Sequence, residues 1–224
     1  MVSEKDILTQ SDIEEEVRLA ALQEREINFS GKILSSLILQ RRTIETGLNL
    51  KDAIVMHSIS LENTVVKGKI DLSNAIVKES FYAGSASIEG DLLLIDAKIN
   101  GVVNLINANI KGTINGTGLI VSGFLSLAKI QAKGDIILRQ AKISDAYHVG
   151  MIVKGDVYMR DALVSGNFDC QESFIEGSLD MLNAFVANNV NLKSAKINGS
   201  LIVKDANIKG NLDLTDSRYP EIIK

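Results

Sequence analysis

Glycine recurs along this chain with a nearly fixed period, at every eleventh position or at twice that interval. The glycines that keep this spacing are Gly68, Gly90, Gly101, Gly112, Gly123, Gly134, Gly155, Gly166, Gly177, Gly199 and Gly210. A fixed internal period indicates a repeat architecture in which each unit stacks on its neighbours. Alignment on the glycines gives the unit G-x-L-x-L-x-x-A-x-I-x, which can be followed from about Thr46 to Ser217 and is clearest in Gly90–Asn100 and Gly199–Lys209.

Apolar residues occupy the third, fifth, eighth and tenth positions of this unit. Two apolar positions separated by one residue are typical of a short strand with one buried face. The seventh position is commonly Asp or Asn, as at Asp52, Asn63, Asn74 and Asp96, and these residues tolerate the positive φ of turns. Each unit therefore predicts two short strands joined by turns.

Two consecutive units contain enough residues to close a coil around aliphatic side chains, whereas one unit does not. We therefore predict an all-β fold, a four-sided parallel β-helix with about 22 residues per coil and about eight coils. A right-handed path is expected because crossovers between parallel strands are overwhelmingly right-handed. With coils about 4.8 Å apart, the result would be a rod about 38 Å long.

The ends of the chain depart from the repeat. Residues 1–45 are expected to form an N-terminal helix and cap, residues 46–217 the β-helix and residues 218–224 a C-terminal tail. The S-x-x-E sequence at Ser11 has the form of a capping box and predicts a helix from about Ser11 to Glu26. This helix would cover the first coil, whose strand edges are otherwise unpaired, or dock on another protein.

The C-terminal tail is short and partly apolar, with Tyr219, Pro220, Ile222 and Ile223 close together. It could fold over the last coil or pair with the same tail of a second molecule. Tyr219, Ile222 and Ile223 are therefore candidates for a homodimer that forms through the C-terminal end.

The repeat also resembles known proteins. Inward pairs with a small residue two positions before a larger one, such as Ala97 and Ile99, resemble those of pentapeptide-repeat proteins, lengthened by one residue on alternate faces. The segments Val153–Cys170 and Ala195–Leu214 resemble long bacterial repeat proteins labelled membrane-associated oxidoreductases. The resemblance implies a β-helix and, from the first group, frequent dimerisation through the C-terminal end, but it supplies no catalytic residues.

Composition narrows the function. The net charge of −4, with acidic and basic residues interspersed, disfavours nucleic-acid binding. The single cysteine, Cys170, allows no internal disulfide, supplies no zinc cluster and is expected in the core. No apolar run reaches the roughly 18 residues of a membrane-spanning helix. We expect a cytoplasmic protein without membrane insertion and without a cofactor.

One interval in the middle of the chain is irregular, since Gly155 comes one position earlier than two full repeat units after Gly134 would place it. We interpret Asp145–Lys154 as a repeat unit that has lost one residue. This places Tyr147 in an inward position and His148 outside, at a disturbed turn, and makes them candidates for a ligand or partner site. The alternative is a tolerated deletion beside an exposed histidine.

The eleventh position of alternate units predicts a further candidate surface. Lys111, Lys133 and Lys154 would stack along one edge of the rod as a basic ladder. Like charges about 5 Å apart repel modestly in water, so the ladder would suit an anionic partner. The alternative is a solvated edge that acidic neighbours neutralise.

The segment Gly112–Gly123 looks like a glycine-rich phosphate loop, but the repeat register assigns it to the core. Such a loop requires a strand before it and a helix after it, and here strands are expected on both sides. The register places Gly116 at an inward position that normally holds Leu, with Leu119 in place of the usual Ala nearby. We therefore predict a repacked core layer with conserved volume.

The predicted function is a non-enzymatic scaffold or protein-interaction module, because the repeat presents no convergent acid, base and nucleophile. One alternative is a filament that assembles from rods. Another is a DNA-mimic inhibitor, as in the gyrase-binding pentapeptide-repeat proteins that the chain resembles. A third is a β-helix enzyme acting on a carbohydrate or acyl substrate. Carbohydrate cleavage usually requires paired carboxylates, and for acyl transfer His148 is the general-base candidate.

Overall fold

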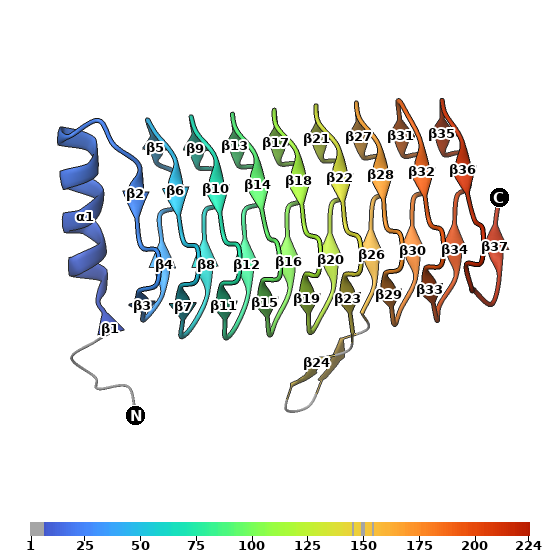
Figure 1. Cartoon of the computed structure of the whole chain (residues 1–224), viewed down its shortest axis with the longest axis horizontal. Coiled ribbons are helices and arrows are strands. Elements are labelled where there is room, and N and C mark those ends of the chain that lie inside the picture. Colours follow the sequence, from blue (N-terminus) through green and yellow to red (C-terminus); the bar gives the residue numbers. More distant parts are fainter. Residues whose placement is uncertain (1–6, 145, 149–150, 154) are drawn as a thin grey trace.

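The computed structural model describes residues 7–144, 146–148, 151–153 and 155–224. Most of these residues form very short strands that stack into an elongated rod, and a helix lies across its N-terminal end (Figure 1). The chain passes in turn through four parallel sheets, named A to D, and then returns to the first one on the next coil.

The strands of each sheet follow one another along the rod. Sheet A contains β1 (Ile7–Leu8), β3 (Ile33–Leu34), β7 (Ile54–Val55), β11 (Ile76–Val77), β15 (Lys98–Ile99), β19 (Ile120–Val121), β23 (Lys142–Ile143), β29 (Phe174–Ile175) and β33 (Lys196–Ile197). Sheet B contains β2 (Ile27–Asn28), β6 (Leu48–Asn49), β10 (Ile70–Asp71), β14 (Leu92–Leu93), β18 (Ile114–Asn115), β22 (Ile136–Ile137), β28 (Phe168–Asp169), β32 (Val190–Asn191) and β36 (Leu212–Asp213).

The other two sheets complete each coil. Sheet C contains β4 (Leu37–Ile38), β8 (Ile59–Ser60), β12 (Phe81–Tyr82), β16 (Val103–Asn104), β20 (Leu125–Ser126), β26 (Val157–Tyr158), β30 (Leu179–Asp180), β34 (Leu201–Ile202) and β37 (Ile222–Ile223). Sheet D contains β5 (Thr43–Ile44), β9 (Val65–Val66), β13 (Ser87–Ile88), β17 (Asn109–Ile110), β21 (Gln131–Ala132), β27 (Leu163–Val164), β31 (Phe185–Val186) and β35 (Asn207–Ile208).

The pairing register confirms the predicted parallel β-solenoid. Ile70 pairs with Leu48 on one side and with Leu92 on the other, so each coil advances by two repeat units. Over the described residues, three sheets have nine strands and sheet D has eight, which gives about nine coils. The expectation of about eight coils was low by one, because β2 to β5 lie upstream of the traced repeat and β37 lies in the tail.

The core is an aliphatic column that runs the length of the rod. Leu48, Ile70 and Leu92 are fully buried at equivalent positions of successive coils, and the Ala residues at the eighth position of the repeat are buried beside them. Alternate residues of each strand therefore point inward, as the period of two predicted.

The turns confirm the assignment of the seventh position of the repeat. Left-handed φ values recur there from one unit to the next, for example at Asp52, Asn63 and Asn74. Asx turns add a local hydrogen bond in the turns that follow some strands, as where the Lys51 N–H donates to Asn49 Oδ1 at 3.0 Å. At such a corner a side chain bonds to the backbone two residues further along the chain.

The Gly116 layer has the predicted compensation. A Cβ atom added to Gly116 would lie 2.9 Å from Leu138 Cδ2 and 3.2 Å from Leu119 Cδ2, and Leu119 is fully buried. The space that a side chain at this position would occupy is already filled by leucines from the same coil and the next. The glycine-rich segment is therefore part of the core.

Helix α1 (Gln10–Leu22) begins and ends earlier than the sequence pattern predicts. Its N-cap is Thr9, which forms a capping box with Asp12, so the capping box expected at Ser11 and Glu14 is wrong. The helix ends at Leu22, and not at Glu26, because Glu24 adopts φ 49° and the Arg25 N–H donates to the Ala20 carbonyl. These are the bonds of a Schellman motif, with Glu in the position that glycine usually takes.

The irregular interval is an insertion and not a shortened repeat unit. Leu125 pairs with Val157, which lies almost three repeat units further along instead of two, and the coil resumes at Gly155. Between the end of β23 and Gly155, strands β24 (Ala146–His148) and β25 (Met151–Val153) pair with each other as an antiparallel hairpin that projects from the rod (Figure 1). The interpretation of Asp145–Lys154 as a repeat unit is therefore wrong, because its strands join none of the four sheets.

Candidate functional site

Helix α1 closes the N-terminal end of the rod by covering the edges of three sheets. Strand β1 pairs with β3 at the edge of sheet A. Gln10 Nε2 donates to the Ile38 carbonyl of sheet C at 3.3 Å, and the Asn28 N–H of sheet B donates to Glu16 Oε1 at 3.0 Å. Polar edge groups that would otherwise face solvent are thus bonded within the chain.

Sheet D differs from sheets B and C at this end, because among the described residues α1 makes no hydrogen bond with the backbone of its first strand, β5, which pairs with β9 on its other side. On the opposite side of β5, the backbone N–H groups of Thr43 and Glu45 and the carbonyl of Thr43 form no hydrogen bond with any described residue. The edge of sheet D is therefore open where the edges of sheets A, B and C are covered.

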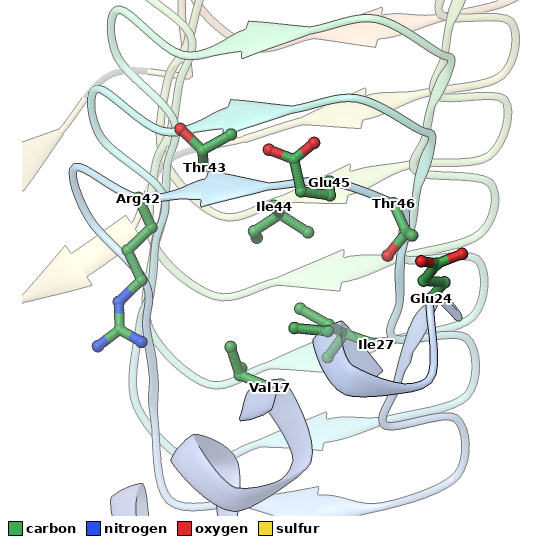
Figure 2. A pocket seen from close by; sticks show the side chains of 9 residues that line it. Val17, Glu24, Ile27, Arg42, Thr43, Ile44, Glu45 and Thr46 are labelled. Carbon is green, nitrogen blue, oxygen red and sulfur yellow. The ribbon is translucent and has the colours of Figure 1, made fainter. Parts of the chain in front are cut away.

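A pocket of about 510 Å³ lies beside this open edge, between β5 and the second half of α1 (Figure 2). Its apolar lining includes Val17 of α1, Ile27 of β2 and Ile44 of β5. Figure 2 shows these three side chains pointing toward a common space, while Thr43 and Glu45 point away from it. We refer to the pocket and the open edge of β5 together as the β5 groove.

The charged residues around the β5 groove are mostly paired. The Arg42 guanidinium donates to both oxygens of Glu14 at 2.6 Å, which holds the pKa of Glu14 below its ordinary value. Glu45 pairs with Lys67 of the next coil. The Glu24 carboxylate lines the groove and makes no ion pair with any described residue, so the rim has an acidic group available to a ligand.

The β5 groove was not found from the sequence, although a signal was present. Each strand of sheet D follows the preceding one by two repeat units up to the hairpin, and the position two units before Ile44 is Leu22, inside the predicted helix. The helix therefore occupies the part of the chain that would have supplied a ninth strand of sheet D.

At the C-terminal end the tail folds onto the last coil. Strand β37 pairs with β34, and Tyr219 and Ile222 pack half-buried against the core, while Ile223 remains exposed. A second groove, of about 340 Å³, lies here between the tail and the last coil, with Ile208 and Leu212 in its lining. We refer to it as the C-terminal groove. It brings two of the three predicted apolar tail residues together.

A polar cluster at the corner between sheets A and C was also missed. His57 Nδ1 lies 3.0 Å from Glu79 Oε1, and Ser58 Oγ donates to Glu79 Oε2 at 2.9 Å. The separation of His57 and Glu79 by two repeat units is the signal that could have shown their proximity. The carboxylate lies between the histidine and the serine, whereas a hydrolytic triad places the histidine between the other two groups.

The predicted basic ladder is wrong. Lys111 and Lys133 are equivalent residues of successive coils, but the next residue along that edge is Ser165, because the hairpin shifts the register. Lys154 lies outside the described residues. Lys111 also pairs with Glu89 at 2.9 Å, and Lys67 pairs with Glu45 in the same row, so the row alternates acidic and basic side chains from Glu45 to Lys111.

The other predicted site residues do not meet at a common site. Tyr147 and His148 lie on β24, where they pair with Ile152 and Met151 of the hairpin. Cys170 is fully buried, as predicted, and burial raises the pKa of its thiol. Such a thiol is a core residue and a poor nucleophile.

Within the described ranges, no group of three or more His, Cys, Asp or Glu side chains is placed to hold a metal ion. No helix in the same ranges has the length and apolar character needed to cross a bilayer. The fold and its two grooves define a β-solenoid repeat protein with one helix-covered end. No protein family, curated protein or solved structure matches the chain.

Proposed function

We propose that the protein is a non-enzymatic scaffold that binds protein partners at the ends of its rod. The observation that carries this proposal is the β5 groove, where an apolar pocket adjoins an unpaired strand edge. Strand edges are sites of pairing with other chains, and natural proteins usually cover them. Along the flanks the strands pair with the coils before and after, so the backbone is already bonded there.

The non-enzymatic part of the proposal is supported by the arrangement of the His57 cluster. Its histidine contacts the carboxylate and not the serine hydroxyl, so the histidine is not placed to activate the serine as it is in a hydrolytic triad. The contacts instead link two successive coils, since His57 and Ser58 belong to one coil and Glu79 to the next. They are best explained as structural cross-links on the surface of the rod.

The C-terminal groove provides a second end for a partner, and a second copy of this chain fits it. Tyr219, Ile222 and Ile223 form an apolar surface next to β35 and β36, which pair with described strands on one side, and a symmetric end-to-end dimer would bury this surface. Dimerisation through this end is also what the resemblance to pentapeptide-repeat proteins implies. Light scattering after size exclusion should then show a dimer that Ile223→Asp converts to a monomer.

The test of scaffold function is an affinity capture from native extract with immobilised wild-type protein and three variants. Ala21→Trp would fill the β5 groove, Ile223→Asp would charge the C-terminal end, and Lys98→Glu on the exposed outer face of sheet A is the control for the flanks. A stoichiometric partner should be retained by Lys98→Glu and lost with one of the two end variants. A partner lost equally with Lys98→Glu, or no partner at all, would contradict the proposal.

A further inference from the structure

We infer that the β5 groove binds an extended segment of a partner protein, which adds to sheet D as a parallel strand. This inference rests on the proposed function, since it specifies how a partner binds at one end of the rod. The starting observation is that β5 is the first strand of sheet D and that the Thr43 and Glu45 N–H groups on its outer edge make no hydrogen bond with any described residue. An added strand would lie at this edge, beside β5.

The hydrogen-bonding pattern inside sheet D shows what this strand must offer. The Val65 N–H donates to the Arg42 carbonyl at 2.8 Å, and the Lys67 N–H donates to the Ile44 carbonyl at 2.9 Å. Thr43 and Glu45 are the equivalent donors one coil earlier, and their N–H groups face the open side of β5. In an added parallel strand, the carbonyl groups that face β5 would accept both bonds, and one N–H group would donate to the Thr43 carbonyl.

The pocket specifies one side chain of the segment. In every described coil the residue aligned with Ile44 points into the core, as Val66 does in β9. The aligned residue of an added strand would therefore enter the space lined by Val17 and Ile27. An aliphatic side chain suits this position, because the lining is apolar and the burial of a Val or Ile side chain is favourable.

The rim specifies the next residue. In β9 the residue after the inward Val66 is Lys67, which pairs with Glu45. The same position of an added strand lies on the side of β5 where Glu24 lines the groove without a basic partner among the described residues. We therefore expect a segment in which an inward aliphatic residue is followed by Lys or Arg.

The probe for this inference is a synthetic peptide that copies Leu61–Gly68 (LENTVVKG), capped at both ends and labelled for fluorescence anisotropy. Two N-methylated versions form a matched pair. In the parallel arrangement the N–H of the Val66 copy faces β5, so N-methylation there should weaken binding at least about tenfold. The N–H of the Val65 copy faces away, so N-methylation there should change the affinity less than about twofold.

Three protein variants test the same contact from the other side. Glu45→Pro removes one of the two donors, while Glu45→Ala keeps the N–H and loses only the side chain. We expect Glu45→Pro to bind the peptide about tenfold more weakly than Glu45→Ala, and Ala21→Trp to abolish binding by filling the pocket. Proline is tolerated at a strand edge whose N–H faces outward, and thermal unfolding should confirm that all three variants are folded.

Several outcomes would overturn the inference. Equal loss from both N-methylated peptides would show that the peptide adheres without strand pairing, and loss only from the Val65 version would show antiparallel pairing. Tighter peptide binding after removal of residues 1–6 would assign the edge to the chain's own N-terminal segment. Concentration-dependent self-association that Glu45→Pro abolishes would assign it to a second copy.

The inference and the proposed function fail separately. If the peptide does not bind, but affinity capture still yields a partner that Ala21→Trp or Ile223→Asp releases, strand addition is wrong and the scaffold function stands. If affinity capture yields no partner, the scaffold function fails whether or not the peptide binds.

Discussion

The two ends of the rod solve the same physical problem with different elements. At the N-terminal end, α1 buries Ile13 and Ala20 against the first coil and bonds to the edges of sheets B and C. At the C-terminal end a single strand, β37, adds to sheet C, and Tyr219 and Ile222 remain half-buried. A coil inside the rod has neighbours on both sides, whereas an end coil must obtain its burial and hydrogen bonds from residues outside the repeat.

The largest expected effect compares one residue from each end. Ile13→Ala should destabilise the protein by about 2–5 kcal/mol, because it empties a fully buried site beneath α1. Ile222→Ala should cost less, about 1 kcal/mol, because its side chain is already half exposed. Urea unfolding followed by hydrogen exchange at β2 and β36 measures both the size of each effect and the end at which it occurs.

Equal losses of unfolding free energy from Ile13→Ala and Ile222→Ala would show that the two ends are equally well packed, which would contradict the expected difference between them. If Ile13→Ala lowered hydrogen-exchange protection at β36 as much as at β2, the rod would unfold as one unit. Nearest-neighbour coupling in repeat proteins instead predicts a loss that is greatest at the mutated end.

The interior layer at Gly116 gives the next largest effect and serves as the reference for both ends. Gly116→Leu should destabilise by about 1–3 kcal/mol, because the new side chain would overlap Leu138 and Leu119. The double variant Gly116→Leu with Leu119→Ala restores the usual volume and should lie within about 1.5 kcal/mol of the wild type. Thermal unfolding of the single and double variants provides the test. If the two variants behave alike, the layer does not exchange volume in this way.

The interior was predictable from the sequence because each coil repeats the same local constraints. The apolar pairs and the turn residues such as Asp52 recur in most repeat units, so the sequence averages many independent copies of one signal. Even the exception at Gly116 could be interpreted, because Leu119 compensates within the same unit. The coil length, the parallel pairing and the buried positions followed from this pattern.

The hairpin and the ends were not predictable in the same way, because each occurs once. The residues of the hairpin fit the repeat within one position, so their apolar character was attributed to the core, and the ladder of Lys111, Lys133 and Lys154 was inferred from the same error. At the N-terminal end, two capping boxes at neighbouring positions compete, and Thr9 with Asp12 forms in place of Ser11 with Glu14. The β5 groove depends on where the helix lies against β5, which no local pattern specifies.

The competing caps give a smaller effect that sharpens the account of the N-terminal end. Thr9→Ala should destabilise α1 by about 1 kcal/mol, because it removes the side chain that accepts the Asp12 N–H. Ser11→Ala is the matched control and should change stability by less than about 0.5 kcal/mol, since Ser11 lies exposed in the first turn. Hydrogen exchange at the first turn of α1 measures both. The reverse order would restore Ser11 as the cap.

The smallest expected effect is a pH dependence confined to the N-terminal end. The Arg25 guanidinium bonded to Glu16 holds the pKa of that carboxyl below its ordinary value of 4.5, although partial burial opposes this shift. A lowered pKa in the folded state contributes stability that is present above pH 4.5 and is lost as the pH falls through the folded value. Because the pair is partly exposed, the loss should be below about 1 kcal/mol.

After correction for the intrinsic pH dependence of amide exchange, the hydrogen-exchange rate at β2 should therefore increase as the pH falls below 4.5. Glu16→Gln should remove most of that increase. Glu15→Gln is the control, because among the described residues Glu15 pairs only with Arg18, on the exposed face of the same helix. If Glu15→Gln flattens the profile as much as Glu16→Gln does, the effect arises from the charge of the helix. A specific response to Glu16 would instead show that its bond to the Asn28 N–H helps to hold α1 on the edge of sheet B.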